Sequence, residues 1–299
     1  MRVTGRPSIG VIGLGNMGGR MAKHLSTKGF VVYGYDVDSG RIAGLSEGGI
    51  KESELENMSD HTDTVILSLP TVSSISAVLK GYRPKKGDII IDMSTVPPSF
   101  SRENHAKLAK NGVSYLDAPV IGMPGGIGDW TVPVGGDREA FERARAVLEA
   151  LASKLYMVGA SGNGAAIKVI NNMISLTTWA VISEAVLLAD KLGIDLTQLY
   201  QIISGSGGGA VSPMLKRVER ILARDYANIC SVDVNIKDLA AAVELGQSAS
   251  VPLLVTSSAL HLHMIASEKG LGNLDMDAIP LAFESFRKRH GRETIAQRK

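Results

Sequence analysis

The residue with the most unusual surroundings in this sequence is a lysine in a largely apolar run, GNGAAIKVINNMI, at positions 162 to 174. In a helix Lys168 and Asn172 lie one turn apart on the same face. An ammonium group among alanine, isoleucine and valine is partly desolvated, which lowers its pKa toward neutrality. The pattern predicts an acid/base lysine with an asparagine beside it that can hold a substrate oxygen. The alternative is a surface lysine whose ammonium group reaches water.

A second stretch, GLGNMG at positions 13 to 18, has the G-x-G-x-x-G spacing that binds a dinucleotide pyrophosphate. It follows an apolar run and opens a helical one, so a helix N-terminus would face the phosphates. Asp36 ends the next β-rich run, roughly 20 residues further on, where a carboxylate binds the adenosine ribose and repels a 2′-phosphate. This favours NAD over NADP. The alternative is that the glycines only form a turn and Asp36 caps a helix. The predicted cofactor residues here are Gly13, Leu14, Gly15, Asn16, Met17, Gly18 and Asp36.

Apolar, β-rich runs alternate with helical patterns from Ser8 to about Gly159. The runs are IGVIG, FVVYGYD, TVILSLP, DIIIDMS and VSYLDAPV. Strands with little polar alternation, separated by helices, indicate a parallel sheet covered on both faces. We therefore expect an α/β protein whose first domain, residues 1–161, is a doubly wound sheet of Rossmann type.

Helical patterns replace the strands after residue 162. Residues 165–192 contain no proline or internal glycine, so a helix at about 164–192 would be ~40 Å long and could lead from one domain into the next. Further helical patterns cover residues 196–204, 214–224, 236–248 and 255–269, and SGSGGG at 204–209 is typical of a loop. The second domain, residues 162–299, is predicted to be all-α.

Composition limits the possible ligands. The 299 residues carry a formal charge of +2, which gives no electrostatic reason to expect nucleic acid or a membrane surface as a partner. A single cysteine excludes an internal disulfide, no zinc-site spacing is present, and no export signal is visible, so we expect a cytoplasmic protein without a metal and with small ligands. The apolar stretch 173–188 carries Glu184 and is short for a membrane span, which favours a buried helix.

Four blocks stand in this order along the chain: GLGNMG, DAPVIGMPGG, GNGAAIKVINN and NIKDLAAAVELG. Together they resemble the β-hydroxyacid dehydrogenase family, which includes 3-hydroxyisobutyrate dehydrogenase and tartronate semialdehyde reductase, and the resemblance covers nearly the whole chain. The resemblance implies hydride transfer between NAD and a small β-hydroxyacid or its semialdehyde or keto acid. It assigns the acid/base role to Lys168 and substrate positioning to Asn172.

The same resemblance implies further site residues. Lys237, from the fourth block, would approach the cofactor, while Leu69, Pro70 and Thr95 would line the dinucleotide and its nicotinamide. The implied substrate-binding residues are Ile121, Gly122, Met123, Lys168 and Asn172. Helical second domains of the family usually form subunit contacts, so a homodimer or homotetramer is expected.

Two substrate-facing segments depart from the family pattern. Ile121 stands where the family has a serine and Met123 where it has a glycine, so the predicted pocket wall is more apolar than is usual. In the later segment SGSGGGAVSP, Gly208 and Gly209 stand where bulky residues are usual. The alternatives to the hydroxyacid enzyme are an imine or other carbonyl reductase and a non-catalytic dinucleotide-binding protein. Lys168 and Asp36 argue against the reductase, and Lys168 argues against the non-catalytic protein.

Overall fold

The computed structural model describes residues 7–46, 48–205 and 217–290. The predicted loop at 206–209 and the first residues of the helix predicted at 214–224 lie outside these ranges. The chain divides into two compact units, residues 1–168 and 169–299, called here the first and second unit. Each is described by itself.

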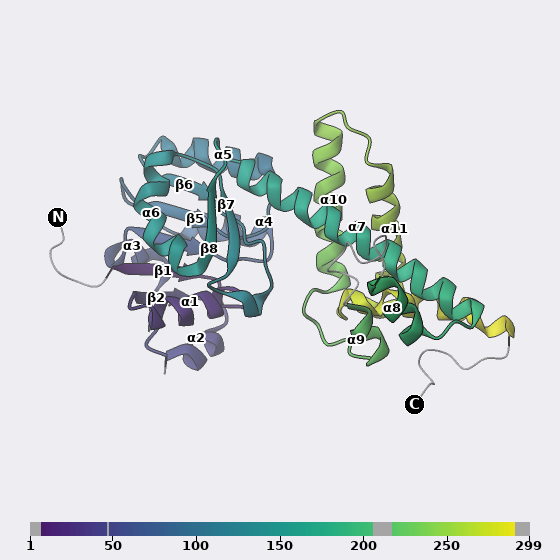
Figure 1. Cartoon of the computed structure of the whole chain (residues 1–299). Helices are drawn as coiled ribbons and strands as arrows, with labels where there is room; N and C mark the ends of the chain where they lie inside the picture. Colours follow the sequence, from purple (N-terminus) through teal and green to yellow (C-terminus); the bar gives the residue numbers. More distant parts are fainter. Residues whose placement is uncertain (1–6, 47, 206–216, 291–299) are drawn as a thin grey trace. The chain divides into compact units, whose positions relative to one another are not determined.

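The first unit is built on a six-stranded parallel sheet with the strand order β3-β2-β1-β4-β5-β6 (Figure 1). Its strands are β1 (Ser8–Ile12), β2 (Val31–Tyr35), β3 (Lys51–Glu52), β4 (Thr64–Leu67), β5 (Ile89–Asp92) and β6 (Ser114–Asp117). The five predicted strands and the parallel sheet they form are confirmed. The edge strand β3 was not predicted, because its two exposed residues, lysine and glutamate, carry no apolar signal.

Both faces of this sheet are buried, as the continuous apolar strands predicted. Along β5, Ile89 and Ile91 belong to one apolar core, whereas Ile90 belongs to another. The first core also holds side chains of α1 (Gly18–Thr27) and α6 (Arg138–Leu151), and the second holds side chains of α4 (Val72–Gly81). The remaining helices of the unit are α2 (Ser39–Ser46), the short helices η1 (Leu55–Asn57) and α3 (Met58–His61), and α5 (Pro98–Ala109).

A second, two-stranded sheet follows β6 and was not predicted. Its parallel strands β7 (Trp130–Val134) and β8 (Ala152–Met157) are joined by α6. The short helical turn η2 (Pro124–Gly126) precedes β7. β8 begins at the residue after α6 ends, and its residues after Ala152 are exposed or half-buried, so the sequence there has neither a turn signal nor an apolar run.

The long predicted helix is confirmed as α7 (Asn163–Leu192), which begins in the first unit and continues into the second. Asp117, at the end of β6, holds its start: Oδ1 accepts hydrogen bonds from the Gly162 amide at 2.8 Å and the Ser161 hydroxyl at 3.1 Å, and Oδ2 accepts one from the Ala165 amide at 2.9 Å. A carboxylate at a helix N-terminus satisfies free amides and interacts favourably with the helix dipole.

By length and composition α7 is apolar enough to cross a membrane, and it is the one such helix among the described residues. Its side chains nevertheless build a protein core: Leu176, Trp179 and Val186 are buried in the second unit. The Trp179 ring nitrogen donates a hydrogen bond of 2.9 Å to the Met276 carbonyl oxygen. These contacts agree with the predicted buried helix.

The regular elements in the described part of the second unit are all helices. It contains α8 (Leu196–Ser204), α9 (Val218–Leu222), α10 (Val232–Ser248), α11 (Leu254–Ala266), the π-helical turn η4 (Ser267–Leu271) and η5 (Met276–His290). α10 and α11 pack side by side (Figure 1). α10 starts four residues earlier than predicted, because the Ser231 hydroxyl accepts a hydrogen bond from the Val234 amide and caps the helix.

Candidate active site

The glycine loop joins β1 to α1, and two of its glycines are required by the fold itself. Gly13 has a positive φ of 91°, and a Cβ there would lie 2.3 Å from the Ser68 carbonyl oxygen. A Cβ on Gly18 would lie 1.8 Å from the Gly13 carbonyl oxygen. A Cβ on Gly15, in contrast, would meet only the end of the Arg41 side chain, at 3.5 Å. Packing therefore does not require a glycine at position 15, whereas the close approach of a pyrophosphate to the main chain does.

Asp36 follows β2 and lies against this loop. Its Oδ2 accepts a hydrogen bond of 2.7 Å from the Leu14 amide, its Oδ1 accepts one of 2.9 Å from the Asp38 amide, and its side chain is 4% exposed. Arg41 Nη1 lies 3.3 Å from Oδ2. Burial raises the pKa of Asp36, but the hydrogen bonds from the two amides and the charge of Arg41 together lower it by more. The pKa is therefore below its usual value, and the carboxyl is ionised at neutral pH. The predicted ribose ligand therefore also braces the phosphate loop.

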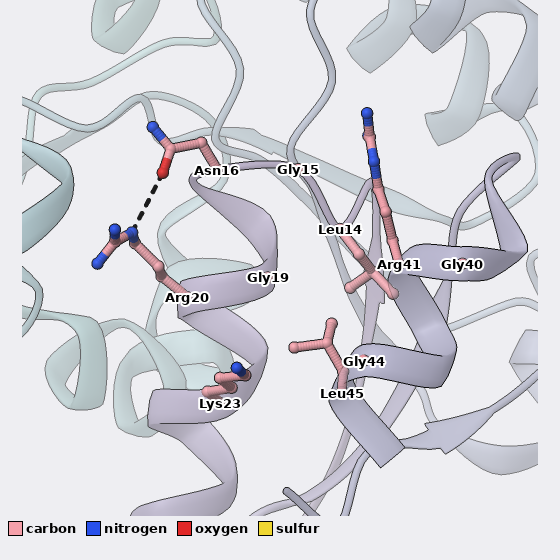
Figure 2. Close-up of a pocket in the computed structure, with 10 residues that line it drawn as sticks. All are labelled: Leu14, Gly15, Asn16, Gly19, Arg20, Lys23, Gly40, Arg41, Gly44 and Leu45. Atoms are coloured by element: carbon pink, nitrogen blue, oxygen red, sulfur yellow. Dashed lines mark hydrogen bonds between the residues drawn. The ribbon is translucent and has the colours of Figure 1, made fainter. Parts of the chain in front are cut away.

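A pocket of about 450 Å³ opens beside the loop, between α1 and α2 (Figure 2). Arg20 and Lys23, on α1, are among its lining residues, and Arg41 extends from α2 alongside the glycine loop. Arg20 is held by a hydrogen bond of 3.2 Å from its Nε to the Asn16 side-chain oxygen. The other lining residues are Leu14, Gly15, Gly19, Gly40, Gly44 and Leu45. Three basic side chains and no acidic one line this pocket, so it favours anionic groups.

The other predicted dinucleotide residues follow the carboxyl ends of neighbouring strands. Leu69 lies two residues beyond β4, and a Cβ on Gly13 would lie 2.8 Å from its side chain. Pro70 comes next, and the half-buried Thr95 follows β5. The structure thus places Leu69, Pro70 and Thr95 at the edge of the sheet that carries the glycine loop, where ligands of open parallel sheets bind.

A buried hydrogen-bond chain that the sequence did not reveal holds this edge together. The Leu69 amide donates to the Ser94 hydroxyl at 3.0 Å, the Ser94 amide donates to Asp92 at 2.9 Å, and the Tyr115 hydroxyl donates to Asp92 at 2.5 Å. Burial raises the pKa of the Asp92 carboxyl. The signal for this chain was an acidic residue at the end of an otherwise apolar strand, β5.

The predicted substrate loop is fastened to Trp130. Ile121 exchanges two main-chain hydrogen bonds with Thr131, at 2.9 and 3.1 Å, so its amide is already engaged. The Trp130 ring nitrogen donates a hydrogen bond of 2.8 Å to the Met123 carbonyl oxygen, and a Cβ on Gly122 would lie 2.5 Å from that ring. Gly122 and Met123 are exposed, and within the described residues their amides make no hydrogen bond. These two amides are therefore available to an anionic group.

Lys168 and Asn172 lie one turn apart on α7, as predicted, and both are half-buried. Near Lys168, Ala165 and Val169 are buried, but Ile170 is 46% exposed, so the apolar run encloses the lysine on one side only. The half-buried Lys168 is therefore shielded from water only in part.

Asn172 has a partner that the sequence analysis did not identify. Its Nδ2 donates a hydrogen bond of 2.7 Å to Asp238 Oδ2 on α10, and its Oδ1 accepts one of 3.2 Å from the Asn171 side chain. The Nζ of Lys237, a cofactor residue implied by the family resemblance, lies 3.5 Å from Asp238 Oδ1. The position of Asp238 directly after Lys237 was the available signal.

Among the described residues, no group of three or more histidine, cysteine, aspartate or glutamate side chains could hold a metal ion.

Comparison with known proteins decides the family. Residues 8–159 match the model of the NAD binding domain of 6-phosphogluconate dehydrogenase, and residues 162–281 match the NAD-binding model of NADP-dependent 3-hydroxyisobutyrate dehydrogenase. The chain is 32% identical to 2-(hydroxymethyl)glutarate dehydrogenase of Eubacterium barkeri, over 93% of this chain and 95% of that one. The protein belongs to the β-hydroxyacid dehydrogenase family. The predicted family and its enzyme class, a nicotinamide-dependent dehydrogenase, are confirmed.

Other relatives of this family member agree. It is 32% identical to L-threonate dehydrogenase of Cupriavidus necator, over 91% of this chain and 94% of that one. The crystal structure of 3-hydroxyisobutyrate dehydrogenase from Salmonella typhimurium superimposes with a TM-score of 0.85 at 27% identity, and covers 93% of this chain and all of that one. An imine reductase from Pseudomonas sp. superimposes with a TM-score of only 0.62 at 24% identity, so it shares the fold alone. The predicted α/β fold with its long helix is confirmed for this dehydrogenase.

Proposed function

We propose that this dehydrogenase transfers a hydride between NAD and a small β-hydroxyacid or the corresponding semialdehyde or keto acid, with Lys168 as general acid/base. The observation that carries the proposal is the pair of Lys168 and Asn172, one turn apart on α7, a helix whose start is held by Asp117. We take residues 1–161 as the dinucleotide domain and residues 162–299 as the helical domain.

The glycine loop fits a dinucleotide, because Gly15 leaves open a space that the packing of the protein does not need. When bound, the nicotinamide supplies the redox chemistry and the protein supplies orientation and one proton. Gly13, Leu14, Gly15, Asn16, Met17 and Gly18 would hold the pyrophosphate, and Leu69, Pro70, Thr95 and Lys237 would line the rest of the cofactor. Leu69, Pro70 and Thr95 follow strand ends, as described above, whereas the role of Lys237, on α10, is proposed from the family resemblance alone.

NAD is proposed as the preferred cofactor because the ionised Asp36 at the end of β2 repels a 2′-phosphate. The basic side chains of Arg20, Lys23 and Arg41 in the adjoining pocket act in the opposite direction. The strength of the NAD preference is therefore set by the balance between one carboxylate and its basic neighbours, and Arg41 already compensates part of the Asp36 charge.

Lys168 would exchange the proton of the reacting oxygen. During oxidation the neutral amine takes the hydroxyl proton of the substrate, and during reduction the ammonium group returns it. Asn172 holds the substrate next to the lysine. The amides of Gly122 and Met123 would bind the substrate carboxylate in place of the missing serine, with Ile121 as the apolar wall.

A panel of acids tests this proposal. The relatives act on 2-(hydroxymethyl)glutarate, L-threonate and 3-hydroxyisobutyrate according to their names, and each of these carries a hydroxyl and a carboxylate. Oxidation of these and other 2- and 3-hydroxyacids is followed by NADH absorbance, and by NADPH absorbance with NADP. We expect turnover of at least one acid, faster with NAD. Turnover of cyclic imines but of no acid would favour the reductase, and turnover of neither would favour a binding protein.

We further propose that the protein is cytoplasmic and forms a homodimer or homotetramer. The second-unit part of α7 exposes Ile174, Val181, Leu188 and Leu192, each more than half exposed. Exposed apolar side chains along one helix favour a subunit interface. Light scattering at micromolar concentration should show a dimer or tetramer, and a monomer would contradict this proposal.

A further inference from the structure

Two buried aspartates end neighbouring strands of the first unit. Asp92 is the last residue of β5, Asp117 is the last residue of β6, and the two are partners in the register of this parallel pair. Each is 1% exposed. Asp117 holds the start of α7, the helix that carries Lys168. The proposed mechanism gives Asp92 no role, although the chain that follows it carries Thr95.

The polar groups bonded to Asp92 donate hydrogen bonds to it. The Ser94 amide donates at 2.9 Å, and the Tyr115 hydroxyl donates at 2.5 Å. Burial, together with the nearby carboxyl groups of Asp92 and Asp117, raises the pKa of Tyr115 well above its ordinary value, so this hydroxyl keeps its proton and acts as a donor. Asp92 therefore fixes the chain directly after β5 against the neighbouring strand β6.

The Ser94 side chain extends this connection to the chain after β4. The main-chain hydrogen bond between the ends of β4 and β5 runs from the Met93 amide to the Leu67 carbonyl oxygen, at 2.9 Å. Two residues further on, the Leu69 amide donates to the Ser94 hydroxyl oxygen at 3.0 Å, and Ser94 is 5% exposed. A buried side-chain hydrogen bond thus continues the ladder past the ends of the two strands.

Leu69 joins this connection to the glycine loop and to the start of α7. A Cβ on Gly13 would lie 2.8 Å from the Leu69 side chain, so the loop and this segment are in close contact. The Leu69 side chain also packs against the apolar core that contains Val96 and Ala165. Ala165 lies three residues before Lys168 on α7. The position of Leu69 therefore depends on Asp92 through Ser94, and the neighbours of Leu69 belong to the candidate site.

We propose that Asp92 is a positioning residue: through Ser94 it fixes Leu69 and Thr95, which would line the nicotinamide half of the cofactor. This inference rests on the proposed function. Hydride transfer requires close contact between the ring and the reacting carbon, and small displacements of positioning groups cost large factors in rate. Asp117 then fixes the helix that carries the acid/base lysine, and Asp92 fixes the chain segments that hold the ring.

A pair of ligands that differ only in the nicotinamide ring tests this role. NADH carries the ring, whereas ADP-ribose ends at the ribose to which the ring is attached. Calorimetric titration of the full chain gives both dissociation constants, and their ratio measures what the ring contributes to binding. Ser94→Ala removes the acceptor of the Leu69 amide. We expect it to weaken NADH binding about 5- to 10-fold and to leave ADP-ribose binding within about twofold of wild type.

Thr62→Val is the matched control. Thr62 lies before the opposite end of β4, is 2% exposed, and donates a hydrogen bond of 2.8 Å from its hydroxyl to the Ser8 carbonyl oxygen. Loss of either buried hydroxyl should lower the melting temperature, but only Ser94→Ala should reduce the preference for NADH over ADP-ribose. Equal weakening of both ligands in Ser94→Ala would show a purely structural role and overturn the proposal. An unchanged preference for NADH would overturn it as well.

Variants of Asp92 test whether the effect comes from its carboxyl group. Asp92→Asn keeps an oxygen that accepts from the Ser94 amide, and its NH₂ group can donate to the Tyr115 hydroxyl oxygen, so the preference for NADH should stay within about threefold of wild type. Asp92→Ala removes both contacts and should lose the preference as Ser94→Ala does. A retained preference in Asp92→Ala would overturn the proposal. If that variant does not fold, Ser94→Ala decides by itself.

The binding measurement needs no hydroxyacid, so it separates failure of this inference from failure of the proposed function. If no acid is turned over but Ser94→Ala loses the preference for NADH, the proposed function fails and the role of Asp92 stands. If acids are turned over, Ser94→Ala should lower kcat about tenfold. A normal kcat with an unchanged preference would mean that this inference fails alone. Wild-type protein that binds ADP-ribose as tightly as NADH would also overturn it, because this edge of the sheet would then not hold the ring.

Discussion

Asp36 in the first unit and Asp238 in the second have similar surroundings. Each is nearly buried, each accepts a hydrogen bond of 2.7 Å from an amide nitrogen, and each lies next to a basic side chain. The donor differs: at Asp36 it is the main-chain amide of Leu14, and at Asp238 it is the side-chain amide of Asn172. The main chain of a tight loop keeps its direction when the acceptor is removed, whereas a side-chain amide can rotate.

The two carboxylates should therefore fail in different ways. Loss of Asp36 should change which dinucleotide binds and leave the chemistry intact. Loss of Asp238 should change the chemistry and leave dinucleotide binding intact. The following variants test the dinucleotide loop and the helix α7 separately, and the largest expected effect comes first.

Lys168→Ala removes the proposed proton transfer on α7. We expect kcat to fall at least ~100-fold, the lower end for a lost general acid/base, with NAD affinity nearly unchanged. Steady-state kinetics and a fluorescence titration with NADH measure the two quantities. Lys191→Ala, an exposed lysine near the end of the same helix, is the control and should keep its activity. Near-normal turnover in Lys168→Ala would show that Lys168 is not the general acid/base.

Gly18→Ala and Gly15→Ala separate the glycine that the fold requires from the one that the ligand requires. A Cβ at position 18 would lie 1.8 Å from the Gly13 carbonyl oxygen, so Gly18→Ala should lose about 2–4 kcal/mol of unfolding free energy or fail to fold. Gly15→Ala should melt close to the wild-type temperature but bind NADH more than ~10-fold more weakly, because the methyl group occupies the space of the pyrophosphate. Calorimetry and NADH titration measure these effects. Normal NADH affinity in Gly15→Ala would contradict the position of the pyrophosphate.

Asp36→Ala should shift the ratio of kcat/KM for NAD and NADP by about tenfold or more toward NADP. The repelling carboxylate is lost, while Arg20, Lys23 and Arg41 remain. The ratio is measured at saturating hydroxyacid. Asp38→Ala, which removes a neighbouring exposed carboxylate that also contacts Arg41, is the matched control and should shift the ratio less. An unchanged ratio in Asp36→Ala would show that this residue does not select the cofactor.

The smallest expected effect is on stability: the contribution of Asp36 to the free energy of unfolding should decrease in acid. Its pKa in the folded protein is below the ordinary value of about 3.9, so the carboxylate stabilises the fold above that pH and this stabilisation is lost as pH falls through the folded pKa. Asp36→Asn should therefore lose about 1 kcal/mol at pH 6, and the difference from wild type should shrink below pH 4. Urea unfolding at the two pH values measures it. A difference that does not change with pH would mean that the charge of Asp36 contributes nothing.

Much of the first unit could be predicted because its signals are local. The glycine loop, the apolar strands and the acidic residue after β2 each depend on a few consecutive residues. Three strands escaped prediction. β3 is only two exposed residues long, and β8 begins directly after α6 and is mostly exposed. β7 is buried, but Pro133 interrupts its apolar run. The substrate loop is similar: Met123 is fastened by Trp130, a contact that spacing along the chain does not indicate.

The sequence by itself determined the parallel sheet, the phosphate loop with its aspartate, and the helix that places Lys168 one turn before Asn172, because periodicity and turn chemistry are properties of neighbouring residues. Only the tertiary structure decided which end of the Asn172 amide is free. Asp238 is 66 residues away along the chain and reaches Asn172 through the packing of α10 against α7. The direction of a hydrogen bond depends on what lies opposite each group, and that is determined only when the helices pack.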